Sequence, residues 1–236
     1  MLAVTTFSPQ GYEDYGRACL ESLDQHWPGK IVAYIEEMPA GVAQRIELRQ
    51  FYEIDNVVAW LERARRHAGS DGESTEDYDF RYNAQKFCRK VFAQDAVFDE
   101  DRYVFWFDAD CVVKQPIPEE FLKGLLDDCA LAYLGRRNSY TETGFIGFDT
   151  QHQNFKTFRD AYLPWIMSGK IFSQLVGWHD CIAFDHARQG VAGRNLTPQG
   201  IGIDNVIGQS VVGKYVSHLK GPRKFKDKYK RDALHV

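Results

Sequence analysis

Residues 103–107 read Tyr-Val-Phe-Trp-Phe, a run that is apolar at every position. A strand with one face in water alternates apolar and polar residues, whereas a strand that is buried on both faces does not. Such a strand belongs at the centre of a parallel sheet that helices cover on both sides. This segment therefore predicts an α/β fold.

Strand-like and helix-like segments alternate along the first half of the chain and are mixed in the second. The predicted strands are Leu2–Phe7, Ile31–Ile35, Tyr103–Phe107, Cys129–Leu134, Thr143–Phe148 and Val211–Val216. The predicted helices are Tyr12–His26, Val57–His67, 82–95, 152–168 and 179–188. The alternation indicates βαβ units with right-handed crossovers, and no linker divides the chain. We therefore expect a single domain over 1–236.

The segment 82–95 has the pattern of an amphipathic helix. Apolar residues at i, i+3, i+4 and i+7 share one face, namely Ala84, Phe87, Cys88 and Val91. Lys86 and Lys90 line another face, which we expect to be polar.

Composition narrows the class of protein. The hydrophobic fraction is 44% and the charged fraction 26%, as in ordinary soluble domains. No apolar stretch approaches the roughly 20 residues of a membrane span, and the N-terminus lacks the pattern of a signal peptide, so we expect a cytoplasmic protein. The five cysteines contain no C-x-x-C pair, which favours reduced, mostly buried thiols over a zinc site or a disulfide framework.

Two carboxylates, Asp108 and Asp110, directly follow the buried strand. In open α/β sheets, ligands bind at the carboxyl ends of the strands. Residues i and i+2 of an extended chain point to the same side, so the two side chains should converge. Converging carboxylates repel unless a cation lies near them, and Mg²⁺ or Mn²⁺ suits oxygen ligands together with nucleotide phosphates. The competing interpretation is a surface turn in which both residues cap the following segment.

Four segments in order resemble glycosyltransferases of the GT-A fold. They are FRYNAQKFCRKVFA leading into YVFWFDADCVV (80–113), TETGFIGFD (141–149), GWHDCIAFD (177–185) and YVSHLKGPRKF (215–225). The last is similar to the H-x-K-G motif of a bacterial and phage group and, more distantly, to the ending of family eight retaining enzymes. Pro222-Arg223 departs from the family eight motif, so the sequence leaves open whether the anomeric configuration is retained or inverted.

The resemblance implies a Rossmann-like, mixed and mainly parallel sheet flanked by helices. It also implies a nucleotide-binding half (1–110), an acceptor half (111–217) and a basic closing loop and tail (218–236). It assigns the metal to Asp108, Asp110 and His218. The donor is assigned to Thr5, Thr6, Phe7, Arg81, Lys86, Lys90, Asp108, Ala109, Gly144, Lys220, Gly221 and Lys224.

Trp178, His179 and Asp180 are the candidate acceptor-side element. Tryptophan offers an apolar platform for a sugar or a base, and Asp180 is a candidate general base, although it would also suit a helix N-terminus. Glu142 is a second candidate catalytic carboxylate near the donor sugar.

The expected function is Mn²⁺- or Mg²⁺-dependent transfer of a sugar from a nucleotide-diphosphate donor, UDP-linked rather than GDP-linked. The acceptor would be a hydroxyl of a saccharide or surface polymer. One alternative is a phage-type DNA glycosyltransferase acting on hydroxymethylated pyrimidines, because the basic stretch 220–231, interleaved with Phe225 and Tyr229, is suited to contact a nucleic-acid backbone. Alternatives of another class are a sugar-phosphate nucleotidyltransferase and a non-catalytic nucleotide-sugar binder.

Overall fold

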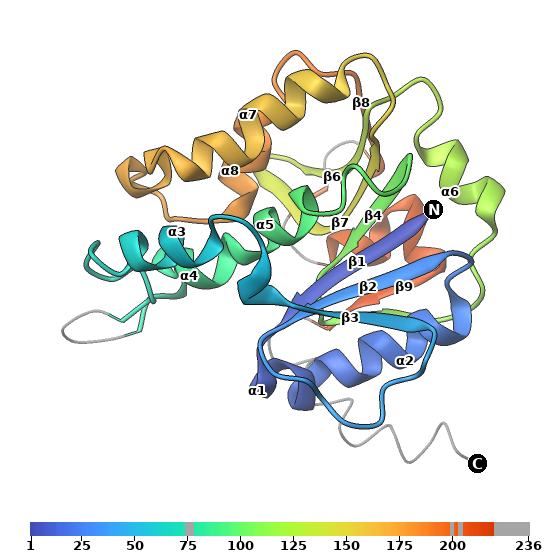
Figure 1. The fold of residues 1–236 in the computed structure, drawn as a ribbon. Helices are drawn as coiled ribbons and strands as arrows, with labels where there is room; N and C mark the ends of the chain where they lie inside the picture. The colour runs from blue at the N-terminus through green and yellow to red at the C-terminus, as the bar shows by residue number, and fades with distance from the viewer. Residues whose placement is uncertain (74–77, 199–200, 203–204, 220–236) are drawn as a thin grey trace.

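A computed structural model describes most of the chain, with the remainder drawn as a grey trace (Figure 1). The described residues are 1–73, 78–198, 201–202 and 205–219. The main sheet has seven strands. In spatial order they are β3 (Ile46–Gln50), β2 (Lys30–Ile35), β1 (Leu2–Phe7), β4 (Tyr103–Phe107), β7 (Ser139–Asp149), β6 (Leu131–Arg136) and β8 (Gly193–Asn195).

The sheet is mixed and mainly parallel. The pairs β3–β2, β2–β1, β1–β4 and β6–β8 are parallel, whereas β7 runs antiparallel to both of its neighbours. A separate two-stranded sheet pairs β5 (Cys111–Val113) with β9 (Val216–His218) in antiparallel fashion. The predicted fold class, one domain with a mainly parallel sheet flanked by helices, is confirmed.

Helices cover both faces of the sheet (Figure 1). They are α1 (Pro9–Gly11), α2 (Arg17–His26), α3 (Val57–Ala64), α4 (Ala84–Phe87), α5 (Arg89–Asp95), α6 (Glu119–Leu125), α7 (Phe155–Met167), α8 (Asp180–Ala187) and α9 (Val206–Gln209). A π-helical turn, Tyr12–Gly16, joins α1 to α2. In the part of the chain that the structure describes, no helix combines the length and the apolar character that crossing a bilayer requires.

Alternate residues of the central strands enter two different cores. Val104 and Trp106 of β4 pack in the core with α3, α5, α7 and α8, whereas Phe105 and Phe107 pack in the core with α2, α6 and α9. Burial of large side chains on both faces is the main source of stability for such a sheet. The strand predicted from the apolar run is therefore correct in position and in its two-sided burial.

The helix predicted over 82–95 needs two corrections. It begins at Ala84, because the Asn83 side chain caps it by accepting a hydrogen bond from Lys86 N, and it is interrupted at Cys88. Lys86 is exposed as expected, but Lys90 is buried, so the two lysines do not share a solvent-facing side. The burial of Lys90 has a physical reason in the site described below.

The strand predicted over Val211–Val216 is wrong for most of its length. Residues Val211–Lys214 form a 3₁₀ turn, and only from Val216 does the chain become β9. A Cβ at Gly213 would lie 2.4 Å from the carbonyl oxygen of Gly208, so the turn packs directly on the backbone of α9.

Strand β3 was not predicted, because its sequence, Ile-Glu-Leu-Arg-Gln, is half polar, as an edge strand allows.

Candidate functional site

The site lies where β4 ends at the carboxyl edge of the sheet. Asp108 extends the β4–β7 ladder by one bond, since its N–H donates to the Gly144 carbonyl at 2.9 Å. The chain then turns, with Cys111 N donating to the Asp108 carbonyl at 2.8 Å, and runs back as β5. This turn places Asp108 and Asp110 at one edge, as the sequence predicts, but gives them different partners.

Asp108 belongs to what we call the lysine side, formed by Lys90, Trp106, Asp108, Thr143 and Asp180. Lys90 Nζ lies 2.7 Å from Asp108 Oδ1 and 3.0 Å from Asp180 Oδ2. It is also 3.3 Å and 3.2 Å from the carbonyl and hydroxyl oxygens of Thr143. The ammonium is thus surrounded by oxygen atoms from β4, β7 and α8.

The charge state of Lys90 follows from this environment. Burial alone would lower the pKa of its ammonium, but Asp108 and Asp180 outweigh that effect and raise the pKa above its ordinary value. Lys90 is therefore a fixed cation at neutral pH. A buried cation between two carboxylates satisfies the rule that buried charges are paired.

Trp106 also contacts Asp108, a contact that the sequence analysis missed. Its indole Nε1 donates to Asp108 Oδ1 at 2.8 Å, and Lys90 Nζ lies 5.6 Å from the centre of its ring. Trp106 precedes Asp108 by two residues and so lies on the same side of the extended chain. That spacing was a usable signal for this hydrogen bond.

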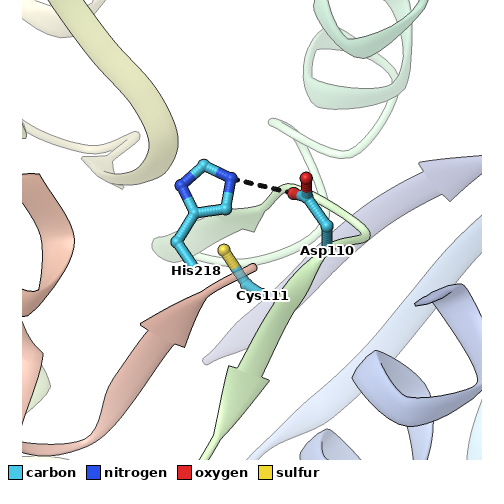
Figure 2. A group of neighbouring side chains, drawn as sticks. All are labelled: Asp110, Cys111 and His218. Atoms are coloured by element: carbon cyan, nitrogen blue, oxygen red, sulfur yellow. Dashed lines mark hydrogen bonds and ion pairs between the residues drawn. The ribbon is translucent and has the colours of Figure 1, made fainter. Parts of the chain in front are cut away.

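Asp110 belongs to what we call the histidine side, formed by Asp110, Cys111, Glu142 and His218. Strand β9 pairs with β5 in a register that sets His218 opposite Cys111, and Leu219 N donates to the Asp110 carbonyl at 2.9 Å. His218 Nε2 is 2.8 Å from Asp110 Oδ1, and Figure 2 shows this nitrogen directed at the carboxylate. The other ring nitrogen, Nδ1, lies 3.9 Å from Glu142 Oε1.

Two overlapping groups of side chains have the chemistry of a metal site. The ligand atoms of Asp108, Glu142 and His218 all lie within 4.8 Å of one another, and so do those of Asp110, Cys111 and His218. The Cys111 sulfur is beside the imidazole in Figure 2, but the thiol donates to the Gly144 carbonyl at 3.4 Å. Burial raises the pKa of that thiol well above its usual range.

Apart from the Cys111 thiol, which hydrogen-bonds to Gly144, the donors of these two groups are carboxylate oxygens and the nitrogens of one imidazole. Carboxylates suit Mg²⁺ and Mn²⁺, and an imidazole added to them suits Mn²⁺. The residues present therefore fit the divalent cation that the sequence implies.

The acceptor-side element predicted from Trp178 to Asp180 leads directly into the lysine side. Asp180 is the first residue of α8 and is 3% exposed. Trp178 is half-buried, its ring packs edge-on against Tyr82, and its backbone N–H donates to the Arg81 carbonyl at 2.6 Å. His179 lies against Phe87 with ring centres 4.5 Å apart.

Other predicted donor residues lie apart from these contacts. Thr5, Phe7 and Ala109 are buried, and the Thr6 hydroxyl donates to the Tyr34 carbonyl at 2.9 Å. Arg81 is paired with Asp79, and Lys86 is exposed on α4. Lys220, Gly221 and Lys224 lie outside the described residues. The residues that the structure brings together are Lys90, Asp108, Asp110, Glu142, Gly144, Asp180 and His218.

No protein-family model and no curated protein matches this sequence. Among solved structures, the chain is similar to mouse xyloside xylosyltransferase 1 in its apo form, with 11% identity, a TM-score of 0.44, and coverage of 83% of this chain and 84% of that one. It is similar to the galactosyltransferase LgtC in complex with donor and acceptor sugar analogues, with 14% identity, a TM-score of 0.48, and coverage of 94% and 88%.

A third similar structure is the apo form of the glycosyltransferase GlyE of Streptococcus pneumoniae TIGR4, with 13% identity and a TM-score of 0.48. The match covers 82% of this chain but only 44% of GlyE, so the chain spans less than half of that protein. All three structures are of sugar transferases. Because every TM-score lies below 0.5, the activity of this chain has to be inferred from the side chains of the site.

Proposed function

We propose that this protein transfers a sugar from a nucleotide-diphosphate donor, UDP-linked in the first instance, to a hydroxyl of a saccharide acceptor. The observation that carries the proposal is that His218 groups with Asp108 and Glu142 and, on another side, with Asp110, at the carboxyl edge of β4 and beside the buried cation of Lys90. That edge is where open α/β sheets bind ligands. The donor set suits Mg²⁺ or Mn²⁺, which such a reaction needs beside its diphosphate.

The acidic residues and the histidine of the site have one proposed role, and the lysine has another. Asp108, Asp110 and His218 would hold the divalent cation, which when bound offsets negative charge on the departing diphosphate. Lys90 supplies a fixed positive charge at the same edge. Its ammonium is held in place by Asp108 and Asp180, so it needs little reorganisation to act on an anionic donor.

Asp180 as general base is part of the proposal. Its carboxylate is nearly buried and paired with Lys90, so it would have to leave that pair before it could accept a proton from an acceptor hydroxyl. Asp180 in its present position instead fixes the lysine. Comparing the turnover of Asp180→Asn with its donor affinity separates the two roles, because a lost base lowers kcat and a lost lysine partner weakens donor binding.

A thermal-shift experiment with nucleotide sugars, with and without Mn²⁺, tests the proposal. A ligand that binds only the folded state raises its stability by RT ln(1 + [L]/Kd). We expect Mn²⁺-dependent stabilisation by UDP-sugars and slow Mn²⁺-dependent hydrolysis of one of them, both lost in Asp110→Asn. Asp127→Asn, at an exposed position, is the matched control. Hydrolysis that persists in Asp110→Asn would refute the metal assignment.

A further inference from the structure

Glu142 is buried in the middle of the histidine side. It lies on β7 and is 4% exposed, so its carboxylate requires partners inside the protein. Oε1 accepts a hydrogen bond from Gly144 N at 3.1 Å, and Oε2 lies 3.6 Å from the Arg136 guanidinium. These two contacts fix the carboxylate, with Oε1 on the side of His218.

The two ring nitrogens of His218 face two different carboxylates. Nε2 is 2.8 Å from Asp110 Oδ1, and Nδ1 is 3.9 Å from Glu142 Oε1. A histidine that binds a metal through one nitrogen almost always donates its other N–H to a carboxylate, a carbonyl or water, which fixes the orientation of the ring. Glu142 is placed to be that outer partner.

Gly144 provides the space for this arrangement. A Cβ at this position would lie 2.7 Å from His218 Cε1, 2.9 Å from His218 Nδ1 and 3.2 Å from Glu142 Oε1. A side chain here would therefore push the imidazole and the carboxylate apart. The backbone φ of Gly144 is not in the left-handed region, so the requirement for glycine is one of space.

We propose that Glu142 is a positioning residue for His218: it holds the imidazole through Nδ1 so that Nε2 is presented to the metal beside Asp110. At 3.9 Å from Glu142 Oε1, Nδ1 would need only a small shift of the ring to donate a hydrogen bond to the carboxylate. This role rests on the metal of the proposed function, and it replaces the catalytic role predicted for Glu142. The competing role is that of a direct ligand, since Glu142 also groups with Asp108 and His218.

A double-mutant cycle with Mn²⁺ alone separates these roles. Mn²⁺ affinity would be measured from the electron paramagnetic resonance signal of the free ion, for wild type, Glu142→Gln, His218→Asn and the double variant. We expect Glu142→Gln to weaken binding about 10- to 100-fold, the usual effect of losing an outer partner. The double variant should bind no more weakly than His218→Asn, because Glu142 acts through the ring.

Losses that multiply in the double variant would show that Glu142 binds the metal directly, and unchanged affinity in Glu142→Gln would show that it does neither. Both results overturn the proposal. Glu100→Gln is the matched control, because Glu100 pairs with Arg49 of β3 and Lys30 of β2, which are not strands of the histidine side. If Glu142→Gln does not fold, Glu142→Asp withdraws the carboxylate by one methylene and should weaken Mn²⁺ binding in the same way.

Failure of this inference is distinguishable from failure of the proposed function. The cycle uses no donor and no acceptor, so coupling between Glu142 and His218 in Mn²⁺ binding would stand even if no nucleotide sugar stabilised the protein. Repeating the wild-type titration with UDP tests the donor. A wild-type chain that binds no Mn²⁺, with or without UDP, would overturn the role of Glu142.

Discussion

Asp108 and Asp110 are two residues apart, yet they belong to sides of the site with different charge arrangements. On the lysine side, Lys90 lies between Asp108 and Asp180, so one ammonium contacts both carboxylates and offsets half of their negative charge. On the histidine side, two carboxylates face one imidazole. The first side is built around a buried ammonium that contacts both carboxylates, whereas on the second an imidazole lies between the two carboxylates and the Arg136 guanidinium lies 3.6 Å from Glu142 Oε2.

This difference separates stability from ligand binding. Removing one member of a buried ion pair leaves an uncompensated charge, which destabilises the folded state strongly. Removing one side chain from a set of metal ligands mainly weakens the binding of the cation, because that side chain's contribution is made to the bound ion. Variants on the two sides should therefore affect different measurements.

The largest expected effect is on stability, from Lys90→Met. It leaves Asp108 and Asp180 without their shared cation and should lower the free energy of unfolding by about 3–5 kcal/mol. Urea unfolding followed by tryptophan fluorescence measures this. Lys86→Met, one turn away and exposed, should stay within about 0.5 kcal/mol of wild type. Equal changes in the unfolding free energy of the two variants would contradict the claim that the pairing of Lys90 with Asp108 and Asp180 stabilises the fold.

The next effect is on metal binding, from His218→Asn. We expect Mn²⁺ affinity to fall about 100-fold or more, because losing a ligand should cost at least as much as losing an outer partner of one. The free energy of unfolding without metal should change far less than in Lys90→Met. His186→Asn, at an exposed position on α8, is the control. A large loss of stability with unchanged Mn²⁺ affinity would show that His218 supports the fold and does not bind the metal.

A smaller effect is expected from Thr143→Val on the lysine side. The substitution keeps the shape but removes the hydroxyl that lies 3.2 Å from Lys90 Nζ, at a cost of about 1–2 kcal/mol in unfolding free energy. Mn²⁺ affinity should stay as in wild type, because the Thr143 hydroxyl hydrogen-bonds to Lys90 and is not one of the candidate metal ligands. A loss of Mn²⁺ affinity would show that the two sides are coupled.

The smallest effect concerns pH and His179. Burial lowers the pKa of its imidazole below the ordinary value of 6.5, so the unfolded chain binds a proton at higher pH than the folded one. Stability therefore falls as the pH drops below about 6.5, and it stops falling once the folded pKa is passed. His179→Asn should flatten this part of the profile, measured by urea unfolding at pH 7.5 and 5.5. Parallel profiles would show that His179 does not contribute.

Much of the fold followed from local pattern. The apolar run 103–107 indicated a two-sided central strand. Its neighbour Leu2–Phe7 and the next strand in the sheet, over Ile31–Ile35, are strands as expected. Strand β3 and the turn at Val211–Lys214 were not predicted, because an edge strand tolerates polar residues and because the turn depends on the contact between Gly213 and α9.

Only part of the site could be predicted from the sequence. The spacing of Asp108 and Asp110 placed both at the sheet edge, and the resemblance supplied His218 from the other end of the chain. Lys90 was expected on a polar helix face, where the surrounding pattern of apolar residues puts it. Its burial depends on Asp180, which is 90 positions away in the numbering, and no local pattern contains that information.

By itself, the sequence determined the class of fold and the position of the two carboxylates, because burial on both faces and the period of a strand are local properties. The tertiary structure decided the partner of each carboxylate. The turn after Asp108 sends one side chain toward α5 and α8 and the other toward β9, so that one meets an ammonium and the other an imidazole. Electrostatic pairing acts through space, and only the folded chain sets those distances.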